Sequence, residues 1–142
     1  MSTTRPLAAI GLGLALAVCP LAPPLAVAGE PASAVETPSP SDLVGTWRVD
    51  LRPTPDADEY WQEFVVRSVD GHTFEGTFYG TELRDGRLNT DWGAVYFAFV
   101  TEDGSGEYHT SGVLKDGRIL GTTHSIGREF LAVWKATPAA SE

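Results

Sequence analysis

The feature that most constrains the fold is a succession of short runs rich in Val, Thr, Phe, Tyr and Trp, separated by glycine-containing turns. These residue types favour pleated strands. No segment keeps the apolar spacing of 3.6 residues that an amphipathic helix needs. The pattern therefore predicts an all-β domain with strands at residues 44–51, 59–69, 72–82, 87–91, 94–101, 106–114, 118–125 and 128–136.

The connections between these runs decide how the strands are arranged. Most are too short to cross a sheet, so strands that follow one another in sequence should pair in antiparallel fashion. A meander that closes on itself leaves no unpaired edge, and eight strands enclose room for packed side chains or one small ligand. We therefore expect an eight-stranded antiparallel up-and-down β-barrel.

The length of the turns decides which face of each strand points inward. Three turns end in glycine: residues 69–71, 115–117 and 125–127. If all three residues form the turn, with glycine in a left-handed bulge, Tyr108 faces His124. If only the last two residues form it, a slip of one residue turns the strand over, and His109 faces His124 instead.

We adopt the three-residue turns because they separate apolar from charged side chains. The inward face then collects Phe64, Val66, Phe74, Phe78, Leu114, Leu120, Phe130, Ala132 and Trp134. The two-residue alternative would line up His109, His124 and Glu129, a metal-binding set by residue type. That row shares its face with lysine and arginine side chains that favour water, so we expect no metal site.

The ends of the chain read as targeting and tethering segments. Arg5, an apolar stretch at 7–18 and the pattern Ala26-Val27-Ala28 are typical of a cleaved signal peptide over residues 1–28. A lipoprotein anchor at Cys19 is the less favoured alternative, because Val18 stands where a bacterial lipobox has a smaller residue. Residues 29–42 read as a Pro/Ala/Ser-rich linker, 43–136 as the barrel and 137–142 as a disordered tail. The expected location is secreted or periplasmic.

The charge balance excludes one class of partner. Cleavage of the signal peptide would leave nine basic against nineteen acidic residues, a net charge of −10. An acidic surface repels phosphate backbones, so we expect no nucleic-acid partner.

A G-x-W motif, Gly45-Thr46-Trp47, opens the first predicted strand, and Gly76-Thr77-Phe78 echoes it. Followed by repeated hairpins, this pattern resembles the calycin group, which contains lipocalins, fatty-acid-binding proteins and avidins. The resemblance implies a closed barrel with one open end. It carries no ligand-contacting residues, because no such set can be matched to this chain.

The predicted topology sorts the turns into two ends. Asp91-Trp92-Gly93 falls at the same end as Trp47 and Trp134. We interpret this end as closed, with Asn89 and Asp91 capping a tight turn and Trp92 covering the floor of the barrel.

The opposite end carries the longest connection, residues 52–59, and long loops at a barrel rim often act as lids. The inward residues near it are the predicted ligand site: Tyr60, Gln62, Phe78, Tyr108, His124 and Arg128. Aromatic walls with a few polar groups are typical of a small-molecule site. The structural alternatives are rim-filling tyrosines, a structural His124, and an ion pair between Arg128 and Glu107.

These observations rank three functions. The favoured one is binding of a small, partly apolar molecule, with space left inside by Gly76, Gly112, Thr110 and Thr122. The second is a protein-binding module, such as a protease inhibitor or envelope partner, that uses the segment 30–42. An enzyme ranks last, because no nucleophile elbow, metal motif or phosphate-binding glycine loop is present; no catalytic residue and no cofactor is predicted.

Overall fold

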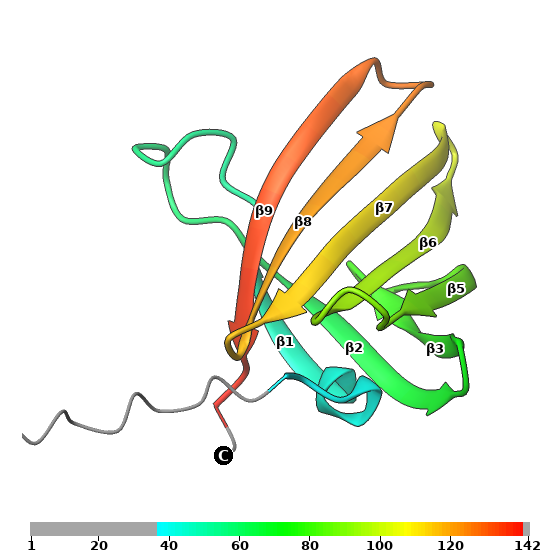
Figure 1. Ribbon diagram of the computed structural model, residues 1–142. Helices are drawn as coiled ribbons and strands as arrows, with labels where there is room; N and C mark the ends of the chain where they lie inside the picture. Colours follow the sequence, from blue (N-terminus) through cyan, green and yellow to red (C-terminus); the bar gives the residue numbers. More distant parts are fainter. Residues whose placement is uncertain (1–36, 141–142) are drawn as a thin grey trace, which may run out of the picture. The chain divides into compact units, whose positions relative to one another are not determined.

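The computed structural model describes residues 37–140, which form a single β-barrel (Figure 1). The elements are η1 (Pro40–Leu43), β1 (Gly45–Asp50), β2 (Trp61–Asp70), β3 (Thr73–Phe78), β4 (Thr81–Glu82), β5 (Arg84–Asn89), β6 (Val95–Asp103), β7 (Gly106–Lys115), β8 (Arg118–Ser125) and β9 (Phe130–Pro138). The predicted signal peptide, Cys19 and most of the predicted linker lie outside the described residues.

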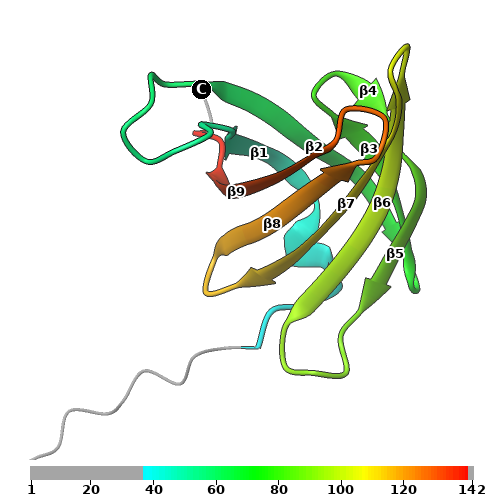
Figure 2. The same cartoon turned by 90° about the horizontal axis from the view of Figure 1, so that it is seen from above.

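The strands close into a barrel. Their order in the sheet is β2-β1-β9-β8-β7-β6-β5-β3-β4, and a further antiparallel pairing of β2 with β3 joins the two ends of the sheet. Figure 2 shows the strands arranged around the interior. Because β4 has only two residues and folds back on β3, eight strands make up the wall. The predicted eight-stranded antiparallel barrel is confirmed.

The third predicted strand, 72–82, is interrupted. Phe78 pairs with Thr81 across a turn at Tyr79 and Gly80, whose φ angles are 54° and 73°. Two consecutive left-handed residues form the tight turn whose twist suits a hairpin. The chain reverses there, and the next wall strand, β5, starts at Arg84 instead of the predicted residue 87.

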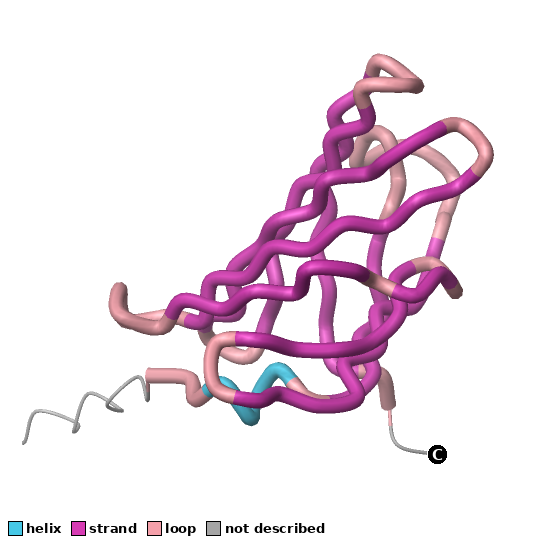
Figure 3. Tube along the Cα trace, turned by 90° about the vertical axis from the view of Figure 1, so that its right-hand side faces the viewer, coloured by secondary structure: helices cyan, strands magenta, loops and turns pink. Residues whose placement is uncertain are grey.

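The end of the predicted linker belongs to the folded domain. Ser39 caps η1: its hydroxyl accepts the N–H of Ser41, and its own N–H donates to Asp42 at 2.7 Å. Leu43 at the end of this helix is fully buried, and its carbonyl accepts the indole N–H of Trp47 at 2.9 Å. Figure 3 shows this single helical turn at the end of the barrel where the described chain begins. Leu43 and Trp47 therefore close this end.

Two expectations for the same end have different outcomes. The backbone N–H of Asp91 donates to the side chain of Asn89 at 3.0 Å, so this stretch is the predicted capped turn. The predicted covering role of Trp92 is wrong, since its side chain is 79% exposed. At the other terminus β9 continues through Thr137 and Pro138, which pair with β1, so the first two residues of the predicted tail are part of the sheet.

The turn between β7 and β8 contradicts the predicted register. Lys115 pairs directly with Arg118, and the two residues between them, Asp116 and Gly117, have φ angles of 52° and 70°. This is the two-residue alternative, which an Asp-Gly pair favours because both positions need a positive φ. It turns β8 over. Ile119 is buried where Leu120 was expected, and Leu120 is 61% exposed.

At two other turns, a second irregularity compensates for the difference from the predicted register. The β2–β3 turn also has two residues, since Asp70 pairs with Thr73, but a bulge between Val66 and Ser68 adds one residue back. Phe64, Val66, Phe74 and Phe78 therefore all point inward as predicted. Four residues, 126–129, separate β8 from β9, one more than predicted. The extra residue compensates for the reversed orientation of β8, so Ala132 and Trp134 still point inward as predicted.

Small residues inside the barrel make room for packing and leave no cavity where they stand. A Cβ atom on Gly76 would lie 1.9 Å from the carbonyl oxygen of Val65, and one on Gly112 would lie 2.5 Å from the ring of Phe97. Thr122 points outward, where its hydroxyl lies 3.3 Å from that of Ser111. The prediction that Gly76, Gly112 and Thr122 open space inside is wrong; the hydroxyl of Thr110 is buried against Thr123.

A buried ion pair holds the end of β1. Two side-chain nitrogens of Arg52 donate to the carboxylate of Asp50 at 2.7 and 2.9 Å, and the side chain of Asp50 is 4% exposed. This paired guanidinium lowers the pKa of Asp50 from 3.8 to about 2.

We expect this pair to make stability depend on acid pH. The lowered pKa of Asp50 contributes free energy of unfolding that is present above pH 4 and is lost as the pH falls towards 2. Asp50→Asn should therefore cost on the order of 2 kcal/mol at pH 7 and flatten the stability profile between pH 4 and 2. Urea unfolding across this range measures both. Glu82→Gln, in an exposed pair with Arg67, is the control and should change stability much less than Asp50→Asn does; equal losses would contradict the assignment.

Candidate functional site

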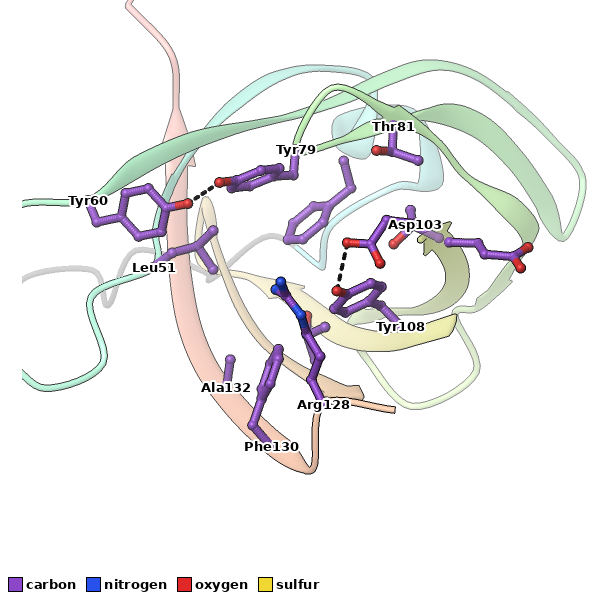
Figure 4. A pocket seen from close by; sticks show the side chains of 13 residues that line it. Leu51, Tyr60, Tyr79, Thr81, Asp103, Tyr108, Arg128, Phe130 and Ala132 are labelled. Carbon is purple, nitrogen blue, oxygen red and sulfur yellow. Dashed lines mark hydrogen bonds between the residues drawn. The ribbon is translucent and has the colours of Figure 1, made fainter. Parts of the chain in front are cut away.

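A cavity of about 290 Å³ lies at the end of the barrel opposite η1 (Figure 4). The connections β1–β2, β3–β4, β6–β7 and β8–β9 surround its mouth, as the up-and-down topology requires. Its lining residues are Leu51, Tyr60, Phe78, Tyr79, Thr81, Thr101, Glu102, Asp103, Tyr108, Thr123, Arg128, Phe130 and Ala132. The predicted open end therefore holds a cavity.

The inner part of the cavity is apolar with a few buried hydroxyls. Phe78 is buried and packs on Trp134, with 5.4 Å between ring centroids. The hydroxyl of Thr123 accepts the indole N–H of Trp134 at 3.1 Å and lies 3.0 Å from the hydroxyl of Thr110. Thr123 and Thr101 are both nearly fully buried. A ligand entering this far would meet aromatic rings and hydroxyl groups.

Two tyrosines meet across one side of the mouth. Tyr60 precedes β2 and Tyr79 stands in the β3–β4 turn, and their hydroxyls are hydrogen-bonded (Figure 4). Their rings are edge to face, with centroids 6.2 Å apart. This hydrogen bond, with partial burial, raises the pKa of Tyr60. The pair ties the long β1–β2 connection to the β3–β4 turn and sets the width of the opening there.

A third tyrosine, Tyr108, is held in place by the β6–β7 hairpin. Tyr108 donates its hydroxyl to Asp103 at 2.7 Å, and the other carboxylate oxygen of Asp103 accepts the N–H of Ser105 at 2.7 Å. These bonds lower the pKa of Asp103 and raise that of Tyr108. Asp103 is therefore an anion with both oxygens engaged, and Tyr108 is a neutral wall of the cavity beside Phe130.

Arg128 lies in the β8–β9 connection. Its backbone N–H donates to the hydroxyl of the buried Ser125 at 3.2 Å, which fixes the start of the loop. Its guanidinium group points into the mouth between Tyr108 and the opposite wall (Figure 4). The alternative ion pair with Glu107 does not form, because Glu107 binds Arg84 at 2.9 Å. Within residues 37–140 the guanidinium of Arg128 has no salt bridge.

The structure brings together four of the six predicted site residues. Tyr60, Phe78, Tyr108 and Arg128 line the cavity. Gln62 is half-buried and lies near Tyr60, whose pKa it affects, but it is not a lining residue.

The prediction that His124 faces the interior of the barrel is wrong. The two-residue turn makes it pair with His109, and it is exposed on the outside of the barrel. Thr123 takes its place inside. The alternative row of His109, His124 and Glu129 does not form either, because His124 pairs with Leu131. Residues 37–140 contain no cluster of His, Cys, Asp and Glu that could hold a metal ion.

Three important lining residues were missed: Tyr79, Asp103 and Phe130. Tyr79 was placed inside a strand, although the glycine after it is a turn signal. Asp103 was placed in a short hairpin turn without a role, and only the fold shows that Tyr108 reaches back to it. Phe130 was correctly expected on the inward face, but its distance from the mouth depends on the length of the β8–β9 connection.

No helix within residues 37–140 has the length and apolar character required to cross a bilayer. No family model matches this chain, no curated protein matches it, and no solved structure matches it.

Proposed function

We propose that this barrel binds a compact, partly apolar small molecule in the cavity at its open end, outside the cytoplasm. The observation that carries the proposal is the convergence of aromatic walls and fixed polar groups on one concave space. Apolar walls drive binding through burial, while a few placed polar groups set orientation. The location rests on the predicted signal peptide.

The size of the cavity limits the ligand. Small-molecule sites range from about 300 to 1,000 Å³, so a cavity of about 290 Å³ suits a molecule of one or two rings. The inner wall is rigid, because Phe78 packs on Trp134 and Phe99, and the hydroxyl of Thr123 is fixed by two partners. Little reorganisation is needed on binding, which favours affinity.

The experiment fills the cavity and leaves the barrel intact. Ala132→Phe adds a ring to a side chain that lines the cavity, whereas Val133→Phe adds one to the neighbouring side chain, which is 70% exposed on the outer face. The probe is 1-naphthaleneacetamide, a neutral two-ring molecule whose binding is measured by calorimetry. We expect Ala132→Phe to weaken probe binding at least about tenfold, since the apolar contact area is taken up. Val133→Phe should change it less than twofold.

The outcome that would contradict the proposal is equally defined. If both variants have the thermal stability of the wild type and Ala132→Phe binds the probe as the wild type does, the cavity is not the binding site. Loss of binding in Val133→Phe alone would place the probe on the outer face of the barrel.

One observation favours a second candidate, a protein-binding surface. Three neighbouring side chains on the outside of β8 and β9 are apolar and exposed: Leu120 at 61%, Leu131 at 64% and Val133 at 70%. Exposed apolar patches often mark protein interfaces. A partner bound here would be lost with Val133→Phe and retained with Ala132→Phe, the reverse of the small-molecule result.

A further inference from the structure

We propose that the ligand carries an anionic group, a carboxylate, and that the guanidinium of Arg128 binds it at the mouth of the cavity. This inference rests on the proposed function and specifies the chemical class of the ligand. Together with the size of the cavity and its aromatic walls, it points to a compact aromatic carboxylate.

Among the described residues at the mouth of the cavity, the carboxylates have hydrogen-bond donors, whereas the guanidinium of Arg128 has free donors of its own. Of the two acids that line the cavity, Glu102 is paired with Arg84 at 3.1 Å, and Asp103 accepts from Tyr108 and Ser105. Both carboxylates therefore already have hydrogen-bond donors. Arg128 is the only cationic residue among those that line the cavity, and its positive charge helps to lower the pKa of the nearby Asp103. Within residues 37–140, however, its guanidinium forms no hydrogen bond and no salt bridge, so its donors remain free. An entering ligand finds free donors and few free acceptors.

Arg128 differs from the other arginines of the described chain, because it lines the cavity and forms no salt bridge. Arg52, Arg67 and Arg84 each bind a carboxylate in an ion pair. Arg48 lies over the ring of Trp61 at 4.0 Å. Arg87 and Arg118 also have no salt bridge, but neither lines the cavity. Arg128 lines a cavity in a chain that has 19 acidic residues and 10 basic ones, yet among the described residues no carboxylate forms a salt bridge with it. A planar guanidinium offers five donors in a geometry that suits a carboxylate.

The position of Arg128 at the mouth also suits contact with a ligand bound in the cavity. Arg128, Tyr108 and Phe130 lie on the same side of the mouth (Figure 4), and Phe78 also lines the cavity. A ligand whose ring packs between these aromatics would place a carboxylate one or two bonds away at Arg128. The hydroxyls of Tyr60 and Tyr79 occupy the opposite side, where they bond to each other.

The experiment uses two probes of the same shape that differ in charge, 1-naphthaleneacetate and 1-naphthaleneacetamide, measured by calorimetry at pH 7. Wild-type protein should bind the carboxylate about tenfold more tightly than the amide, and added salt should weaken only the carboxylate. Arg128→Gln should lose this preference, so that the carboxylate and the amide bind with affinities within about twofold of each other. Arg128→Lys should retain part of it. Arg118→Gln, an exposed arginine outside the cavity, is the matched control and should behave as the wild type.

The outcomes separate this inference from the function on which it rests. Suppose that the amide binds, that Ala132→Phe abolishes this binding, and that the carboxylate binds no more tightly than the amide. The cavity is then a binding site, and the inference on charge is wrong. An equal loss of preference in Arg118→Gln would also overturn it, because the effect would then be one of net charge. If neither probe binds, both proposals fail.

Discussion

Replacing Phe64 with alanine is expected to lower the free energy of unfolding by about 3–5 kcal/mol. Phe64 is fully buried in the centre of the barrel, and its ring lies 5.4–6.3 Å from those of Phe74, Phe78, Phe97 and Phe99. These four rings come from two other strands, β3 and β6, so the cavity left by alanine cannot close without moving the wall. A domain of this size has only about 5–15 kcal/mol in total, so the loss removes a large share of it.

Urea unfolding of purified variants measures this effect. Tyr96→Ala is the control, because Tyr96 is also an aromatic residue in a strand but is 44% exposed on the outside of β6. It should cost less than about 1 kcal/mol. If Phe64→Ala costs no more than Tyr96→Ala, the aromatic cluster is not the centre of the core.

Replacing Gly76 with alanine is expected to cost about 3 kcal/mol by the opposite mechanism, overpacking. The new Cβ would lie 1.9 Å from the carbonyl oxygen of Val65 and 3.1 Å from the Cα of Val66, and both are backbone atoms. A backbone atom cannot rotate away, so β2 and β3 must separate or the bulge after Val66 must rearrange. Because β2–β3 pairing closes the barrel, the strain falls on the closure itself.

Gly104→Ala is the matched control for this glycine. Gly104 lies in the β6–β7 turn, no atom lies within 4 Å of its added Cβ, and its φ is not in the left-handed region. Its stability should be equal to that of the wild type or slightly higher. A Gly76→Ala variant that unfolds at the same urea concentration as Gly104→Ala would show that β2 and β3 do not approach as closely as described.

The class and topology of the fold could be predicted from the sequence, because they depend on strand periodicity and on connections too short to cross a sheet. The orientation of individual strands could not be predicted reliably, because it depends on a single residue in each turn. At Asp116-Gly117 the chain uses a two-residue turn, which sends His124 outside. At the β2–β3 turn the same shortening is cancelled by a bulge near Arg67, which no glycine or proline marks in the sequence.

The residues of the candidate site could also be predicted only in part from the sequence. Tyr60 and Arg128 were found because they stand next to long or glycine-bearing connections at the predicted open end. Phe78 and Tyr108 were found because they alternate with polar residues in their strands. Tyr79 was missed because the turn that holds it uses a tyrosine at a φ of 54°, which is rare for an aromatic residue.

The central claim is that the open end of the barrel is a small-molecule site, and its most direct test is an NMR titration with 1-naphthaleneacetate. The account predicts that the amide signals of residues around the mouth, such as Tyr79, Asp103 and Phe130, shift in a saturable way, while those of His109 and His124 on the outer face stay constant. Shifts confined to the outer face or to the closed end around Asp91, with the mouth unchanged, would contradict it.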